Sequence, residues 1–122
     1  MKKLIAFFEI PATDLNRAVK FYQSVLNTKL SVHDWGQEKM AFFPEESGVC
    51  PGAISWSPTF KPSKDGVLIS LNCDSIEDSL ATVEANGGKT VIPKTKIEAE
   101  NRGYFSVCID SEGNSIGLYS DL

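Results

Sequence analysis

The hydrophobic pattern of this 122-residue chain occurs twice. Apolar residues recur at three- and four-residue steps from Leu15 to about residue 27, and again from Ile76 to about residue 86. This spacing is typical of helices with one buried side. The second pattern begins 61 residues after the first, which is half the chain length, and its apolar or small positions coincide with those of the first. Such repetition predicts two similar supersecondary modules.

Segments rich in β-favouring residues flank both predicted helices. They cover residues 3–10, 30–33, 40–43 and 53–57 in the first half, and 67–72, 90–93, 104–109 and 115–120 in the second. Thr13 or Asp14 can cap the first helix, Ser75 with Asp78 can cap the second, and the Asn-Gly-Gly sequence at 86–88 is a helix-stop signal. The polar segment 94–102 is predicted to be a mobile loop.

Each half therefore reads strand, helix, strand, strand, strand. The predicted fold is α+β, with two tandem βαβββ modules forming one curved mixed sheet around a cleft. We predict a single domain over residues 1–122, with module one at about 1–58, a linker at about 58–66 rich in Pro, Gly and Ser, and module two at about 66–122.

Alternation along the strands separates an apolar face from a mixed face. The apolar face of the first strand (Leu4, Ala6, Phe8 and Ile10) and that of its repeat (Val67, Ile69 and Leu71) are predicted to lie under the helices. The mixed faces are predicted to line the cleft, with Phe7, Glu9, Ser55, Leu68, Ser70, Gly117 and Tyr119. An apolar cleft with a few polar groups is typical of a small-molecule site. The alternative is that these faces simply meet solvent.

Composition and charge limit the kinds of partner and the cell compartment that we expect. The net charge is −4 and the basic residues are scattered, so we expect no nucleic-acid partner, which would need a basic stripe. No apolar run reaches the roughly 20 residues of a membrane span, and Glu9 and Pro11 interrupt the apolar start, which we interpret as a strand. The three cysteines (Cys50, Cys73 and Cys108) lack metal-like spacing and fit free thiols in a reducing cytoplasm.

Three segments carry a family resemblance. They are FEIPATDL (8–15) leading into RAVKFY (17–22), NGGK (86–89) followed by Val91, and GYFSV (103–107) continuing to DSEGNSIGLY (110–119). The chain resembles the vicinal-oxygen-chelate superfamily, which holds glyoxalase I, bleomycin-resistance proteins and extradiol dioxygenases, and within it the small glyoxalase-like branch. The resemblance implies two βαβββ modules around a cleft, and frequent homodimers.

In metal-using members, four strand positions facing the cleft supply His, Glu or Gln ligands to a divalent ion. Carried over by this resemblance, those positions fall on Phe7, Ser55, Leu68 and Gly117. Three of these side chains offer no ligand atom, and a serine hydroxyl is a feeble one. We therefore expect no metal at the family position, no cofactor, and no glyoxalase mechanism, which needs a metal to polarise the substrate.

Glu9 is the candidate catalytic residue or anchor. Burial beside Phe7 and Tyr119 would desolvate its carboxylate, which suits a general base or an anchor for a cationic ligand. The alternative is a rim carboxylate paired with a lysine or a backbone donor. The other candidate ligand-binding residues are Phe7, Trp35, Phe42, Ser55, Leu68, Ser70, Tyr104, Gly117 and Tyr119. Trp35 and Phe42 can equally be packing residues, with Trp35 covering the cleft mouth, and the single histidine, His33, is interpreted as a rim residue.

Three hypotheses follow for the function. The first is a metal-free small-molecule binding protein that uses the cleft between the modules. The second is a lyase or isomerase with Glu9 as general base, with or without a noncanonical divalent metal. The third is a dimeric accessory subunit whose cleft is vestigial. Whether the chain is an enzyme stays open, and a homodimer is expected because the open edges of a curved sheet favour pairing.

Overall fold

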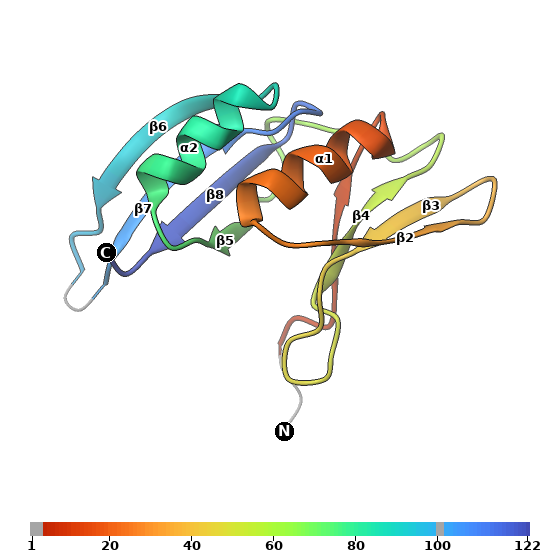
Figure 1. Cartoon of the computed structure of the whole chain (residues 1–122), viewed down its shortest axis with the longest axis horizontal. Helices are drawn as coiled ribbons and strands as arrows, with labels where there is room; N and C mark the ends of the chain where they lie inside the picture. The colour runs from red at the N-terminus through yellow and green to blue at the C-terminus, as the bar shows by residue number, and fades with distance from the viewer. Residues whose placement is uncertain (1–3, 100–101) are drawn as a thin grey trace.

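A computed structural model of the chain describes residues 4–99 and 102–122 (Figure 1). The elements follow in the order β1 (Phe8–Pro11), α1 (Leu15–Leu26), β2 (Ser31–Asp34), β3 (Lys39–Phe42), β4 (Gly52–Trp56), β5 (Ser70–Asn72), α2 (Ile76–Ala85), β6 (Lys89–Lys96), β7 (Tyr104–Ile109) and β8 (Ser115–Ser120). Neither helix is long and apolar enough to cross a membrane.

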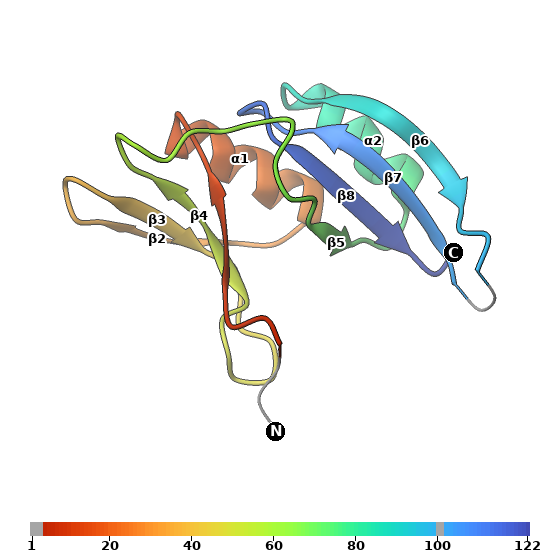
Figure 2. The same ribbon diagram turned by 180° about the vertical axis from the view of Figure 1, so that it is seen from behind.

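The strands form two four-stranded sheets with the same plan. Their orders are β1-β4-β3-β2 and β5-β8-β7-β6, and in each sheet the first pair is parallel and the others are antiparallel. The described residues show no strand pairing between β1 and β5, so there are two half-sheets where the sequence predicted one continuous sheet. Both helices lie on one side of the sheets, and the opposite side is seen in Figure 2.

Both predicted helix starts are confirmed. The Asp14 carboxylate accepts a hydrogen bond from the Arg17 amide at 3.1 Å, and the Ser75 hydroxyl accepts one from the Asp78 amide at 3.2 Å. Each satisfies an amide that the helix leaves without a partner in its first turn. The second helix ends just before the Asn-Gly-Gly sequence, where Gly87 has φ of +92°.

The core lies between the helices and the sheets. From α1 it takes Leu15, Ala18, Phe21, Tyr22 and Val25; from the first sheet Ile10, Ala41 and Ile54; and from the second half Ile76, Val83, Cys108, Ile116 and Leu118. The two helices also pack against each other, so this one cluster spans both modules. The apolar face predicted for each half is thus confirmed in part.

The first predicted strand of each half was wrong at its start, because both strands begin later than the sequence indicated. β1 begins at Phe8, which is paired with Gly52, the first residue of the parallel strand β4, and residues 4–7 belong to no strand. Leu4 is 98% exposed, and Ala6 is also exposed. β5 begins only at Ser70, and Val67 is 90% exposed. The predicted loop at 94–102 is also partly wrong, since β6 extends to Lys96; residues 100 and 101 lie outside the described residues.

The turn between β7 and β8 joins the two modules. Asp110 is buried; its carboxylate accepts hydrogen bonds from the Glu112 and Asn114 amides at 2.8 and 2.9 Å, from the Asn114 side chain at 3.0 Å, and from the Tyr22 hydroxyl of α1. The Asn114 side chain also donates to the Pro11 carbonyl at 2.8 Å. Burial and the Asp110 charge raise the pKa of Tyr22 well above its ordinary value, so the phenol stays a donor.

Glu112 extends this connection to the start of α1. Its carboxylate accepts from the Thr13 and Asp14 amides at 3.0 and 2.8 Å and from the Arg17 guanidinium at 2.7 and 3.0 Å. Burial raises the pKa of Glu112, but the bonds from Arg17, the Asp14 amide and Ser111 outweigh it and lower the pKa overall. The second module thus provides an anionic side chain at the N-terminus of the first helix, where its dipole favours negative charge.

Candidate functional site

The mixed face of the first sheet follows from strand register. The register places on this face Glu9, Pro11, Ser31, His33, Met40, Phe42, Ala53 and Ser55. The Phe7 ring joins them beside Phe42. Across the sheet, Glu9 is paired with Ala53 and Ala53 with Phe42, so these three lie in one row. The charged pair Asp34 and Lys39 alternates to the other face.

Four aromatic side chains form a cluster on this face, named here the aromatic cluster (Phe7, His33, Trp35 and Phe42). The rings of His33 and Trp35 are stacked, with centroids 5.7 Å apart and an interplanar angle of 12°. Phe42 lies edge-on to both, at 5.4 Å from His33 and 6.5 Å from Trp35, and its ring is 6.3 Å from that of Phe7. Trp35 is 58% exposed and Phe7 is 38% exposed.

Glu9 lies beside this cluster on the same face. Its carboxylate accepts a hydrogen bond of 2.7 Å from the Ser55 hydroxyl. Ser55 is buried at the base of the face, whereas Glu9 is exposed. Of the two alternatives for Glu9, the structure favours the rim carboxylate, and its partner is the Ser55 hydroxyl rather than a lysine or a backbone donor. Tyr119 belongs to the second sheet.

The second sheet arranges its mixed face differently. Ser70 is paired with Gly117, and Asn72 with Tyr119. The Tyr119 hydroxyl accepts a hydrogen bond from the Gly103 amide at 3.2 Å and donates one to Asp121 at 2.8 Å, so its hydrogen-bonding groups are already used.

Tyr104 does not join this face. It is paired with Ser120, one position out of step with the Phe105–Tyr119 pair, so it points to the helix side and packs against the core. The ammonium of Lys94 lies 4.5 Å from the centre of its ring. Placing Tyr104 with the cleft residues was wrong, because a one-residue step along a strand moves a side chain to the opposite face.

A groove of about 720 Å³ separates the two sheets along β1 and β5. Phe7, Leu68 and Ser70 line it together with Phe8, Leu26, Phe43, Pro44, Leu71 and Asn72. The structure thus brings three of the predicted cleft residues together here. Trp35 and Phe42 do not line the groove; Trp35 packs on Phe42, and Phe42 packs on the Phe7 ring, which does. Gly117 and Tyr119 do not line it either.

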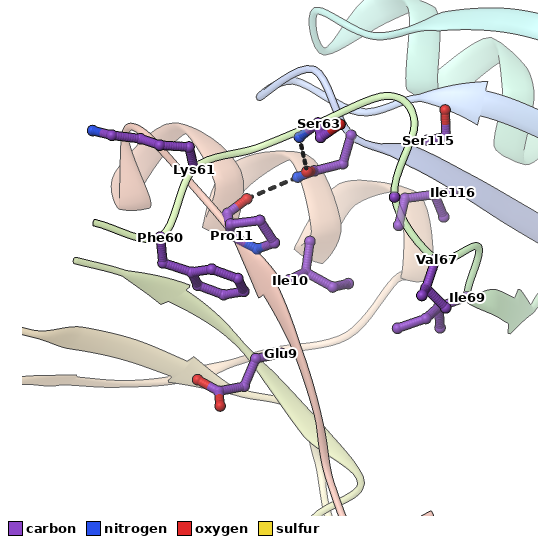
Figure 3. Close-up of a pocket in the computed structure, with 12 residues that line it drawn as sticks. Glu9, Ile10, Pro11, Phe60, Lys61, Ser63, Val67, Ile69, Ser115 and Ile116 are labelled. Carbon is purple, nitrogen blue, oxygen red and sulfur yellow. Dashed lines mark hydrogen bonds between the residues drawn. The ribbon is translucent and has the colours of Figure 1, made fainter. Parts of the chain in front are cut away.

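A second, smaller pocket of about 270 Å³ lies at the other end of the same edge (Figure 3). Glu9 and Ile10 line it from β1, Ile69 and Ile116 from the second half, and Phe60 from the linker. The close-up shows the Phe60 ring beside β1 and the Lys61 side chain pointing away from the pocket. Sequence reasoning missed Phe60, because its segment was interpreted only as a linker.

Two of the three cysteines, Cys73 and Cys108, are unsuited to act as reactive thiols. Cys108 is buried in the core, and burial together with the Asp110 charge raises its pKa to about 12. Burial raises the pKa of Cys73 as well. Since the thiolate is the nucleophilic form, these groups are suited to packing.

Comparison with known proteins identifies the family. The sequence profile of the Glyoxalase/Bleomycin resistance protein/Dioxygenase superfamily matches residues 4–118. The chain belongs to this superfamily. A "Glyoxylase-like domain-containing protein" from Didymella fabae is 29% identical over 114 residues, which cover 91% of this chain and 88% of that protein.

Solved structures of superfamily proteins show the same fold. A glyoxalase/bleomycin resistance protein from Albidiferax ferrireducens T118 has a TM-score of 0.73 and 19% identity, with 97% of this chain and 98% of that chain covered. The fosfomycin resistance protein FosX from Listeria monocytogenes has a TM-score of 0.69 and 16% identity, with coverage of 98% and 91%. The predicted α+β fold class is confirmed.

The metal that the superfamily implies does not fit the side chains of this member. Phe7, Leu68 and Gly117 provide no donor atom, and the Ser55 hydroxyl is engaged with Glu9. A Cβ at position 117 would collide with the Ser70 hydroxyl and lie 3.2 Å from the Ser70 Cβ, so a longer ligand there needs β5 to shift. Within the described ranges, no group of three or more His, Cys, Asp or Glu residues is placed to hold an ion.

Proposed function

We propose that the protein binds a small organic molecule without a metal, using the groove between β1 and β5 and the adjoining mixed face of the first sheet. A single observation supports this proposal: apolar side chains stand at positions where the superfamily resemblance implies side chains that bind a metal. Phe7 and Leu68, at two positions where the superfamily resemblance implies metal ligands, both line the groove. Apolar concavities with few polar groups are the usual form of small-molecule sites.

The free energy of binding requires the ligand to contact several side chains. Aromatic side chains bury about 150–250 Å² when covered, and apolar burial contributes about 25 cal/mol per Å². One ring therefore supplies about 4–6 kcal/mol before the costs of association are subtracted, whereas micromolar affinity needs about 8 kcal/mol after those costs. The ligand must cover several groups together, with Ser70 and Glu9 as its polar contacts.

We propose further that the protein is a homodimer of the cytoplasm. β1 and β5 are edge strands, and Leu4 and Val67 beside them are almost fully exposed. A second copy can cover this apolar surface and complete the walls of the groove. The three cysteines are free thiols, which suits a reducing compartment.

The dimer can be tested separately from ligand binding. Leu4→Asp combined with Val67→Asp puts charges on the exposed segments that precede the two edge strands, and we expect a dimer mass by light scattering to fall to a monomer mass. Glu84→Gln on α2 is a control that leaves these edges unchanged. A monomer mass for the wild-type protein at micromolar concentration contradicts this part of the proposal.

Binding is tested with a panel of aromatic antibiotics and aromatic metabolites. We expect at least one compound to raise the melting temperature and quench tryptophan emission, and Leu68→Asp to remove the effect. Ile92→Asp, an exposed apolar-to-acidic change on β6, is the matched control. Stoichiometric zinc, nickel, manganese or iron in the purified protein, or no response to any compound, overturns the proposal.

The structure weakens the support for an enzyme with Glu9 as base, because Glu9 is exposed rather than desolvated. We therefore favour binding over turnover. Loss of an activity in Glu9→Gln with folding unchanged would reverse this preference.

A further inference from the structure

We infer that the ligand is a flat aromatic cation, bound by the aromatic cluster together with the Glu9 carboxylate. This inference rests on the proposed function, since it assigns a ligand class to the same face. It adds the sign of the ligand's charge and the residues that select for it.

The aromatic cluster is a preformed stacking surface. His33 and Trp35 are already parallel at 5.7 Å, and Phe42 supports both edge-on. Trp35 is more than half exposed although it has the largest apolar area of the four. Exposed aromatic groups that lie together, rather than singly, mark a surface that another molecule covers. A planar ring system matches the plane of the stack.

Other aromatic side chains in this protein show what the cluster lacks. The Lys39 ammonium lies 5.0 Å from the centre of the Trp56 ring, and Lys94 lies 4.5 Å from that of Tyr104. Both pairs lie on the helix-facing sides of the sheets, as the strand registers show. Among the described residues, no lysine or arginine lies over a ring of the aromatic cluster. The negative ring faces of the cluster are therefore open to a cation from outside.

Glu9 provides the charge that complements such a ligand. It is the one acidic side chain among the residues that strand register places on this face. No described cation forms an ion pair with it; its partner is the neutral Ser55 hydroxyl. Ser55 orients the carboxylate without neutralising it, so the negative charge remains available to a ligand.

The spacing suits a fused ring system. Glu9, Ala53 and Phe42 lie in one row on three adjacent strands. With neighbouring strands about 4.8 Å apart, the Glu9 and Phe42 backbones are about 10 Å apart. The residue between them contributes only a methyl group. A molecule of two or three fused rings can therefore contact Phe42 with its ring and Glu9 with its charge.

The test uses two probes that differ mainly in charge: N-methylquinolinium, a cation, and quinoline, which is uncharged at neutral pH. Titrations are done on Trp56→Phe protein, in which Trp35 is the only remaining tryptophan. Affinities come from calorimetry and from saturable quenching of Trp35 emission. We expect the cation to bind about tenfold more tightly than quinoline, as a charge-assisted contact would give.

Variants separate the two parts of the site. Glu9→Gln is expected to remove the preference for the cation and leave quinoline affinity unchanged. Phe42→Leu is expected to lower the affinity for both probes severalfold. Glu84→Gln removes the same charge from α2 and is expected to change neither affinity. Added salt should lower the affinity for the cation and leave the affinity for quinoline unchanged. This second test needs no variant.

Equal affinity of the two probes for the wild-type face overturns the inference and leaves the proposed function standing, as does equal loss in Glu9→Gln and Glu84→Gln. Cation binding that survives Phe42→Leu unchanged also overturns it. Failure of the proposed function is recognised separately, by the absence of any response across the wider panel.

Discussion

On the first sheet the mixed face carries four aromatic rings beside a carboxylate that has no described ion-pair partner. On the second sheet the equivalent face holds Ser70, Gly117, Val107, Phe105 and a Tyr119 whose hydroxyl is already bonded twice. The second module contributes instead the turn at 110–114, which holds α1 of the first. One repeated plan therefore carries the proposed ligand contacts in one copy and a structural connection in the other. Changes in the turn should affect folding, and changes in the aromatic cluster should affect binding alone.

The largest effect is expected from Asp110→Ala. Its buried carboxylate accepts four hydrogen bonds, from the Glu112 and Asn114 amides, the Asn114 side chain and Tyr22. Their loss leaves buried donors without partners, and we expect the free energy of unfolding to fall by about 3–5 kcal/mol. Urea denaturation measures this, with Tyr22→Phe as a milder companion at about 1–2 kcal/mol. Loss below 1 kcal/mol in Asp110→Ala would show that the turn does not hold the modules together.

A smaller effect is expected from Gly117→Glu, which restores an acidic residue at a superfamily ligand position. Its Cβ must displace Ser70, so we expect a loss of about 1–3 kcal/mol from overpacking. Three other positions still lack ligands, so calorimetry should detect no zinc or nickel binding. Metal binding by this single variant would mean that the face is closer to a metal site than its side chains indicate. Ser115→Glu, on the same face, is a control for added charge.

The acid dependence of stability should report the connection between Glu112 and Arg17. The Glu112 pKa is lowered in the folded protein, so its contribution is complete above about pH 4.5, the ordinary value, and is lost as pH falls through the lowered folded value. We expect about 1–2 kcal/mol from its hydrogen bonds at neutral pH. Glu112→Gln should flatten the decline of stability below pH 4.5. An identical acid slope in the variant would assign the decline to other carboxylates.

The smallest effect is expected at Ser106, whose hydroxyl is buried and has no hydrogen-bond partner among the described residues. Removing an unsatisfied buried polar group is neutral or favourable, so Ser106→Ala should change the free energy of unfolding by about 0–1 kcal/mol toward stability. Ser120→Ala is the matched control, because the Ser120 hydroxyl bonds to Asp74 and Leu122. It should lose about 1 kcal/mol in thermal or urea melts. A clear loss in Ser106→Ala would reveal a partner for that hydroxyl.

The parts of the fold that depend on local signals were predictable. β7 and β8 match the predicted 104–109 and 115–120, and both helix caps lie where Asp14 and Ser75 indicated. The predicted starts of β1 and β5 were wrong, because alternation does not say whether a partner strand exists; β1 begins at Phe8, opposite the first residue of the parallel strand β4. Within the candidate site, the Phe7 ring lies 6.3 Å from the ring of Phe42, which shares a row with Glu9.

Contacts between distant residues were not predictable in the same way. Glu112 reaches Arg17 across 95 residues of sequence, and no local pattern encodes that contact. The stacking of His33 on Trp35 had a signal, since residues two apart in a strand share a face, but the single histidine was interpreted as a rim residue. The misplacement of Tyr104 reflects register, which only the paired strand fixes.

The central claim is that ligand binding at this surface needs no metal. Its most direct test is the affinity of a panel compound, measured by quenching of Trp35 emission before and after exhaustive chelation with EDTA. The account predicts the same dissociation constant in both samples, and no change when zinc, nickel or manganese is added back. Binding that disappears on chelation and returns with one of these ions would contradict it.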